Sequence, residues 1–443
     1  MGSARRRSVY SQKGVKINMS LIVQKLDLED YKEKHNPFDR HELCRNCIDY
    51  DDCEFACQDY KELTELYDAW NKGFDRAISL KQNFSKKMKH KFNYLWTLQD
   101  ANFTKDKGTV FSCFACAGGS TMGYKLAGFD VIGCNEIDKK VNEIYVANHH
   151  PKLNYQCDIR DLVEKAKAKE LPEELYNLDV LDGSPPCKLF SMGGTREKYW
   201  GVERKFNEGQ KKQVLDTLFF DFIELGNVLR PKIIIAENVK GLTQGNAKKY
   251  VRKIGEELYQ AGYDCLMFLL NSKNMGVPQR RERVIFICIR QDLKTNIPKE
   301  GLFDSPYINM TFKEPEIKYG LFADTNEEYK IPPAYYRLWK ERIYGEGSME
   351  DASLRVDGKN NMFAVKYCYK ERVLPTITAK KEGTVSFYKP SYLSDREVTI
   401  GSSFPLDFNY LGSPANYVCG MSVPPIMMAQ IASRVYEEWL SKI

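Results

Sequence analysis

Residues 108–119, GTVFSCFACAGG, and residues 129–138, FDVIGCNEID, decide the fold. Each begins as a short apolar run typical of a buried strand, and the first ends in two glycines ahead of a helical pattern. Further strand-like runs are LDVLDGSPPC at 178–187, KIIIAENV at 232–239 and RVIFICIR at 283–290. Helical patterns lie between these runs. Strands that alternate with helices predict an α/β fold with a doubly wound, mostly parallel sheet, which binds ligands at the carboxyl ends of its strands.

The composition sets broad limits on function. The chain has 443 residues, enough for two to three domains. It contains no apolar stretch of the ~18 residues that a membrane span needs, so we expect no membrane association. The net charge of +6 permits a nucleic-acid partner without requiring one. Residues 1–14 carry positive charge with no apolar run behind them, so no secretory signal is expected.

The cysteine count points to a reducing compartment. Thirteen cysteines cannot all pair within the chain, because the total is odd. Without a secretory signal we expect a cytoplasmic protein whose cysteines are free thiols, metal ligands or a nucleophile.

Changes in composition divide the chain into four parts. Residues 1–104 form a polar, mainly helical N-terminal extension, and residues 105–290 form the α/β domain. Residues 291–371 are rich in Tyr, Lys and Glu and suggest a separate lobe. Residues 372–443 regain order, and a helix is expected to begin at the Pro-Pro pair 424–425 and pack back on the α/β domain.

The glycine turn indicates a cofactor site. Phe114, Gly118 and Gly119 lie between a strand and a helix, where a ligand can approach the backbone closely. Glu136 ends the next strand, where an acid can bind ribose hydroxyls, and Asp158 follows a further strand end. Together they suggest a nucleoside-containing cofactor. The alternative is a glycine turn that serves packing alone.

Two residues at strand ends are candidates for catalysis. Cys187 follows two prolines and precedes a glycine-containing segment, which is a suitable place for a nucleophilic thiol. The alternative for Cys187 is a small buried hydrophobic residue. Glu237 emerges from the apolar strand KIIIAENV and could act as a proton donor, or as a cap or ion-pair partner.

A further group of polar residues precedes the strand at 283–290. Gln279, Arg281 and Arg283 stand at alternate positions, so in an extended chain they point to one face. An amide and two guanidinium groups suit an anion or a polar base edge. The alternative is a solvated run of charges.

The N-terminal extension holds a cluster of cysteines. Cys44, Cys47, Cys53 and Cys57 follow the pattern C-x2-C-x5-C-x3-C. A structural zinc ion is the leading interpretation; an iron–sulfur cluster and a metal-free helical region are the alternatives.

Six short motifs in order identify a family. They are FACAGG, NEID, DGSPPC, AENVKG, QRRER and GMSVPP. With them the chain resembles the DNA (cytosine-5) methyltransferases of prokaryotic and phage type, over about residues 108–290 and 372–443. The resemblance implies the Rossmann-like fold of methyltransferases that use S-adenosylmethionine. It also implies a double-stranded DNA partner and a target-recognition region at 291–371. We expect a monomer.

The resemblance also implies roles for single residues. Cys187 would be the nucleophile and Glu237 would contact the cytosine at N3 and its amino group. Arg281 and Arg283 match an active-site arginine pair, of which Arg283 is the better candidate to hold the base. The residues expected at the cofactor are Phe114, Gly118, Gly119, Glu136, Ile137, Asp158, Pro186 and Ser422.

The chain departs from the family pattern at four places. Lys188 replaces a glutamine, Cys116 replaces the first glycine of the turn, and Met421 replaces an asparagine. The acid that is common before Phe114 is absent, because Ser112 and Cys113 stand there. The last three departures bear on the shape of the cofactor pocket.

Two other functions share these motifs. A tRNA cytosine-5 methyltransferase would carry the same set, although the roughly 80 residues between QRRER and the Pro-Thr-Ile-Thr motif at 375–378 favour a lobe that reads DNA. A non-enzymatic DNA-binding or regulatory protein could use the same scaffold, but it is expected to have lost the nucleophile or the acid.

Overall fold

The computed structural model describes residues 90–186, 217–243, 247–297, 307–324, 329–359, 362 and 365–443. The chain divides into two compact units, Met1–Lys87 with Asp324–Asn326 and Met88–Ala323 with Glu327–Ile443. All helices and strands of the described residues belong to the second unit. Residues 90–104, the described part of the extension predicted to be mainly helical, contain no helix.

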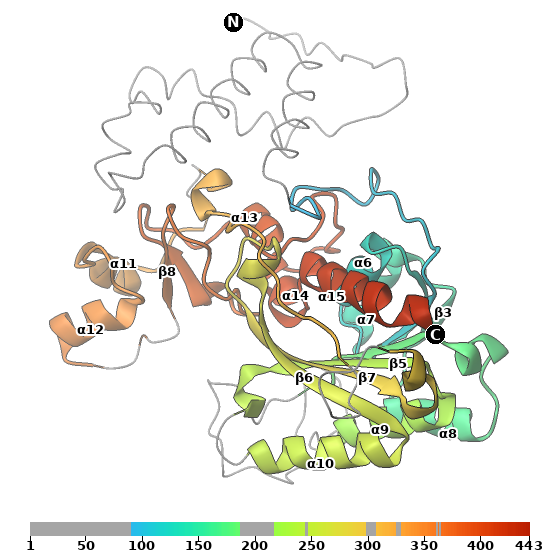
Figure 1. Cartoon of the computed structure of the whole chain (residues 1–443). Helices are drawn as coiled ribbons and strands as arrows, with labels where there is room; N and C mark the ends of the chain where they lie inside the picture. Colours follow the sequence, from blue (N-terminus) through green and yellow to red (C-terminus); the bar gives the residue numbers. More distant parts are fainter. Residues whose placement is uncertain are drawn as a thin grey trace, which may run out of the picture. The chain divides into compact units, whose positions relative to one another are not determined.

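A seven-stranded sheet forms the centre of this unit (Figure 1). Its spatial order is β3-β2-β1-β4-β5-β7-β6. The strands are β1 (Thr109–Cys113), β2 (Asp130–Asn135), β3 (Leu153–Tyr155), β4 (Val180–Gly183), β5 (Ile233–Val239), β6 (Tyr263–Asn271) and β7 (Glu282–Arg290). Neighbours from β3 to β5 pair in parallel, whereas β7 runs antiparallel to both β5 and β6. The mostly parallel α/β fold is thereby confirmed.

Helices cover both faces of the sheet (Figure 1). One face carries α6 (Gly119–Leu126), α7 (Lys139–His149) and α15 (Pro425–Glu438), and the other carries α8 (Ile159–Lys167), α9 (Leu218–Leu229) and α10 (Ala247–Gln260). Successive residues of a strand point to opposite faces, so the continuous apolar runs supply two cores. On β5, Ile233 and Ile235 join one core while Ile234 and Ala236 join the other.

A smaller lobe has a core of its own. It contains α11 (Pro333–Lys340), α12 (Met349–Asp357) and the parallel pair β8 (Lys366–Cys368) and β9 (Thr384–Ser386). Trp339, Met349, Tyr367 and Val385 are among its buried residues. This core therefore takes in residues on both sides of position 371. The chain then continues through α13 (Asp395–Gly401) and α14 (Ala415–Met421) to α15.

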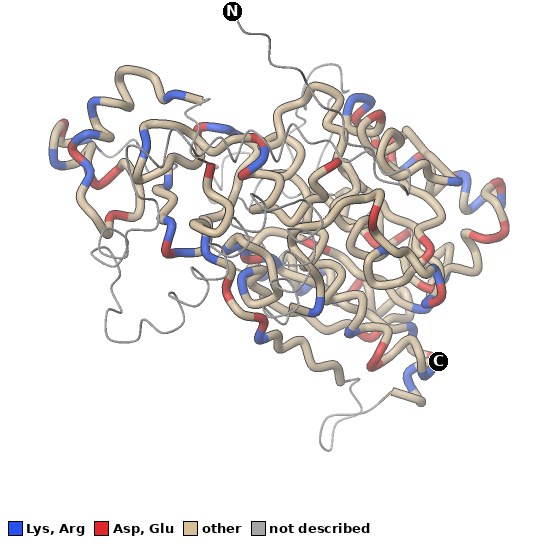
Figure 2. The backbone as a smooth tube through the Cα atoms, turned by 90° about the horizontal axis from the view of Figure 1, so that it is seen from above, with Lys and Arg blue, Asp and Glu red and all other residues tan. Residues whose placement is uncertain are grey.

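Charge is distributed widely over the described backbone. Figure 2 shows basic and acidic residues interspersed along the tube. This agrees with the near balance of 66 Lys and Arg against 60 Asp and Glu. None of the helices that the structure describes between residues 90 and 443 combines the length and apolar character of a membrane span.

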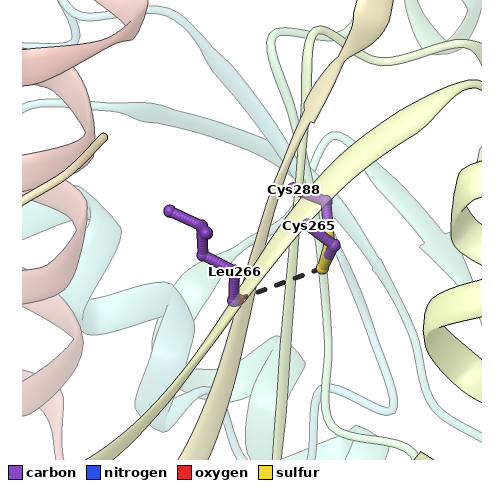
Figure 3. Close-up of a disulfide and its surroundings, with 3 residues drawn as sticks. All are labelled: Cys265, Leu266 and Cys288. Carbon is purple, nitrogen blue, oxygen red and sulfur yellow. Dashed lines mark hydrogen bonds between the residues drawn. A yellow bond between two sulfur atoms is a disulfide. The ribbon is translucent and has the colours of Figure 1, made fainter. Parts of the chain in front are cut away.

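One pair of cysteines corrects the expectation of unpaired thiols. Cys265 on β6 and Cys288 on β7 form a disulfide (Figure 3). The two residues face each other in the antiparallel register, and their Cα atoms are 3.9 Å apart. The sequence pattern does not reveal this pair, because β6 was not among the predicted strands. Cys113, Cys116, Cys134, Cys157, Cys368 and Cys419 are free thiols, as expected.

Candidate active site

Glu237 and Arg283 form an ion pair at the edge of the sheet where β1 to β5 end. Arg283 Nε lies 2.7 Å from Glu237 Oε1, and the two side chains are 13% and 12% exposed. Glu237 is near the end of β5, whereas Arg283 is near the start of β7. The antiparallel direction of β7 brings both to the same edge, where Arg283 faces Val239 in the register. Burial lowers the pKa of Arg283, while the charge of Glu237 and its hydrogen bond act in the opposite direction.

The glycine turn after β1 has an unusual backbone. Phe114, Cys116 and Gly118 have φ values of 51°, 48° and 88°, all in the left-handed region. A Cβ atom at Gly118 would overlap the ring of His149, and one at Gly119 would overlap the carbonyl oxygen of Val423. Both glycines are therefore needed for close packing, and Gly118 is also needed for its left-handed conformation.

A pocket opens beside this turn. Of the residues predicted at the cofactor, Phe114, Gly119 and Ser422 line it. The complete lining of this pocket consists of Ser112, Phe114, Ala115, Cys116, Gly119, Ser120, Asp182, Ser184, Met421, Ser422 and Val423. The pocket thus combines the ends of β1 and β4 with the loop before α15, which is more than 290 residues further along the chain than the turn.

Glu136 anchors the turn from the end of β2. Its carboxylate accepts hydrogen bonds from the backbone N–H groups of Cys116 and Asp138, each at 2.9 Å. Burial raises the pKa of Glu136 to about 7, although these backbone hydrogen bonds act in the opposite direction. The half-buried Ile137 follows directly.

Asp158 caps helix α8. Its side chain accepts a hydrogen bond from the backbone N–H of Arg160 at 3.0 Å and pairs with the Arg160 guanidinium at 2.6 Å. Burial alone would raise the pKa of Asp158, but the bonds to Arg160 prevail and lower it.

Asp182, which the sequence interpretation missed, is a further carboxyl group at this edge. It is 1% exposed and accepts hydrogen bonds from Ser112 Oγ at 2.7 Å and from the Tyr124 hydroxyl at 3.2 Å. Burial raises the pKa of Asp182 to about 7. The sequence places this aspartate at the end of a predicted strand. Its hydrogen-bond partners are about 60 and 70 residues away in the sequence, so a local pattern could not identify its environment.

The proline segment before the predicted nucleophile is attached to β5. Asn238, which is 3% exposed, donates a hydrogen bond from Nδ2 to the carbonyl of Pro185 at 3.2 Å. Pro186 is half-buried. Cys187 and Lys188 lie outside the described residues.

The predicted metal ligands Cys44, Cys47, Cys53 and Cys57 also lie outside the described residues. Within the part of the chain that is described, no group of three or more His, Cys, Asp or Glu side chains is arranged to hold a metal ion.

Gln279 and Arg281 form hydrogen bonds to distant segments of the chain. Gln279 is 1% exposed and accepts the Ile377 N–H at 3.0 Å, while its amide group donates to the Gly401 carbonyl at 3.2 Å. Arg281 is 2% exposed and donates to the carbonyls of Ile377 at 3.1 Å and Gly420 at 3.0 Å. Burial lowers the pKa of Arg281 to about 9.

Comparisons with known proteins identify the family of the chain. The family model described as C-5 cytosine-specific DNA methylase matches residues 108–437. The type II methyltransferase M.FnuDI of Fusobacterium nucleatum is 36% identical over 210 residues, which cover 47% of this chain and 53% of that protein. M.NgoPII of Neisseria gonorrhoeae is 33% identical over 192 residues, which cover 43% and 51%. The chain thus spans about half the length of these two relatives.

Solved structures share the fold. A crystal structure of a DNMT2 mutant from Spodoptera frugiperda aligns with a TM-score of 0.53 and 16% identity, covering 74% of this chain and 99% of that one. A prophage-encoded protein of E. coli aligns with a TM-score of 0.52 and 19% identity, with the same coverage. Because the family model covers most of the sequence, including both the sheet edge and the returning C-terminal helix, the chain belongs to the C-5 cytosine-specific DNA methylase family.

Proposed function

We propose that this protein transfers a methyl group from S-adenosylmethionine to carbon 5 of a cytosine flipped out of double-stranded DNA, with Cys187 as the nucleophile. The arrangement around β5 carries the proposal. Glu237 pairs with Arg283, and the next residue, Asn238, binds the carbonyl of Pro185, two residues before Cys187. One strand thus connects the acid to the segment that leads to the nucleophile.

The residues at the sheet edge suit S-adenosylmethionine. The pocket lined by Phe114, Gly119 and Ser422 lies beside the backbone of the turn, which allows close approach of a ligand to that backbone. The carboxylates of Glu136 and Asp158 suit the ribose hydroxyls and the adenine amino group, and Phe114 offers an aromatic face. Gly118, Gly119, Ile137, Pro186 and Ser422 would complete the site. When bound, the cofactor supplies an electrophilic methyl group on a sulfonium.

The residues of the chain would act on the cytosine in three ways. The Cys187 thiolate forms a bond to carbon 6, and the displaced electron pair makes carbon 5 nucleophilic. Glu237 binds N3 and the amino group and stabilises the charge that develops on the ring. Arg283 orients Glu237 and holds the base. When carbon 5 later loses its proton to solvent, the bond from Sγ to carbon 6 breaks and the cysteine is regenerated.

Flipping is required because carbon 6 cannot be reached inside a stacked duplex. The smaller lobe built from α11, α12, β8 and β9 includes most of its elements within residues 291–371, where the family pattern places target recognition, and adds β9 from beyond that stretch. We propose that it reads the bases that flank the cytosine.

Bisulfite sequencing of DNA from a host that expresses the chain tests this function. We expect 5-methylcytosine within one short target sequence in the wild type, and none with Cys187→Ala. Cys265→Ala is the matched control and should retain methylation, because Cys265 lies on the outermost strand β6 and does not line the pocket. Methylation that persists in Cys187→Ala contradicts the mechanism. Transfer to tRNA but not to duplex DNA contradicts the proposed substrate.

A further inference from the structure

The carboxyl group of Asp182 is buried at the edge of the sheet. Asp182 on β4 faces Ser112 on β1 in the parallel register, and both side chains are 1% exposed. Its two oxygens accept hydrogen bonds from Ser112 and from Tyr124 of α6. In the part of the chain that the structure describes, no lysine or arginine forms an ion pair with this carboxylate. Burying a carboxylate without an opposite charge costs folding free energy. Such a group is therefore expected to have a function that offsets this cost.

The pocket beside Asp182 indicates what that function is. Asp182 lines it together with Ser112, Gly119 and Ser422. The family resemblance implies that Gly118 and Gly119 line the methionine end of the cofactor. That end of S-adenosylmethionine carries two positive charges, the sulfonium and the α-ammonium group, together with the negative α-carboxylate. A buried carboxylate facing either charge would gain a cationic partner, which no described residue supplies.

The position of Asp182 also relates to the missing acid of the family pattern. That acid commonly precedes Phe114, where this chain has Ser112 and Cys113. Asp182 reaches the same place from the neighbouring strand, because its carboxylate lies 2.7 Å from the Ser112 hydroxyl. A side chain on β4 can thus present its charge to the pocket in place of one on β1.

We infer that Asp182 is a cofactor-binding residue whose carboxylate faces the positive charge at the methionine end of S-adenosylmethionine and replaces the acid that is absent at Ser112 and Cys113. This inference rests on the proposed function. It gives a role to the first residue of DGSPPC, which the resemblance leaves without one, and explains how the pocket keeps a negative charge despite the departure from the family pattern.

Isothermal titration calorimetry with Asp182→Asn tests the inference without measuring catalysis. Asparagine keeps both hydrogen bonds, since its oxygen accepts from Tyr124 and its amide group donates to Ser112. We expect the Kd for S-adenosylmethionine to rise about ten- to a hundredfold, as for loss of a hydrogen bond to a charged group. S-adenosylhomocysteine, which has the ammonium group but no sulfonium, separates the two charges. An equal loss for both ligands assigns Asp182 to the ammonium group, and a loss for S-adenosylmethionine alone assigns it to the sulfonium.

Two further variants separate charge from structure. Ser112→Ala removes a hydrogen bond but keeps the carboxylate, so its Kd should change less than about threefold. The double variant Ser112→Asp/Asp182→Ser moves the acid to β1 and should recover most of the lost affinity.

An unchanged Kd in Asp182→Asn overturns the inference. No recovery in a double variant that keeps the wild-type melting temperature overturns the replacement of the β1 acid. Wild-type protein that fails to bind S-adenosylmethionine would instead overturn the proposed function itself.

Discussion

At the residue scale, Glu237 and Arg283 form an ion pair between two largely buried groups. Burial of either charge alone would be unfavourable. Each side chain is only about one-eighth exposed, so each charge depends on the other. The pair therefore holds the Glu237 side chain in one orientation toward the strand edge. A base that approaches this edge meets a carboxylate that is already positioned, which reduces the reorganisation needed for catalysis.

Glu237→Gln is expected to reduce methyl transfer about a hundredfold or more, because the amide cannot supply the charge that stabilises the ring. The protein should remain folded, since the oxygen of the new amide still accepts a hydrogen bond from Arg283. Transfer of labelled methyl groups to DNA, with a parallel thermal melt, measures both effects. Glu282→Gln is the matched control: Glu282 pairs with Lys240 at 2.8 Å and is 39% exposed, so activity should stay within about twofold. Activity near the wild-type level in Glu237→Gln would contradict the assigned role.

Asp182 also makes stability depend on pH. Its pKa in the folded protein is raised from 3.8 to about 7, so the folded protein binds a proton more tightly than the unfolded chain does. The stability that this proton contributes is complete below pH 3.8 and is lost as the pH rises to 7. Between about pH 4 and pH 8 we expect the wild type to lose about 2–4 kcal/mol relative to Asp182→Asn, which has no such proton. Urea unfolding of the cofactor-free proteins at both pH values measures this difference, and parallel curves for the two proteins would contradict it.

At the scale of elements, the contact between α6 and α15 explains the spacing of the glycines. A Cβ at Gly123 would lie 2.5 Å from both the Met428 Cβ and the Pro425 carbonyl oxygen. Gly119, one helical turn earlier, meets Val423 in the same way. The start of α15 is thereby held against α6, so that Ser422 and Val423 reach the pocket beside β1.

Gly123→Ala is expected to lower the free energy of unfolding by about 1–3 kcal/mol, because the added methyl group overpacks this contact. Gly255→Ala on α10 is the matched control, since nothing lies within 4 Å of a Cβ added there. The control should stabilise the protein by about 0.5–1 kcal/mol through helix propensity. Chemical denaturation of both variants measures their free energies of unfolding. A stabilised Gly123→Ala would show that the two helices are not in close contact.

At the scale of the whole molecule, the C-terminal segments complete a site that begins more than 200 residues earlier. Arg281 binds the carbonyls of Ile377 and Gly420, and Gln279 binds the backbone at Ile377 and Gly401. These bonds connect the end of the α/β domain to the segment that carries Ser422 and α15. The described hydrogen bonds of Arg281 thus support the structure, and Arg283 forms the ion pair with Glu237.

Arg281→Ala is expected to lower the free energy of unfolding by about 2–4 kcal/mol, because two buried carbonyls lose their donor. Arg281→Lys should recover little of this loss, since an ammonium group lacks the planar fork that reaches both carbonyls. The neighbouring Arg280→Ala is the control and should change stability by about 0.5 kcal/mol or less, because Arg280 is exposed. Thermal or urea unfolding distinguishes the three, and equal stability of Arg281→Ala and Arg280→Ala would contradict the structural role.

The sequence by itself determined the α/β class, the run of strands from β1 to β5 apart from the short β3, and the polar residues that end them. Apolar runs followed by glycine or acidic residues are local patterns, and the carboxyl ends of parallel strands meet at one edge of the sheet. Only the tertiary structure decided which of these residues meet. The direction of β7 brings Arg283 to Glu237, while Arg281, two residues earlier, turns to Ile377 and Gly420. Asp182 is paired with Ser112 across 70 residues, and Cys265 with Cys288 across β6 and β7. These pairings depend on strand order and register, which are set by packing between distant segments and leave no local pattern in the chain.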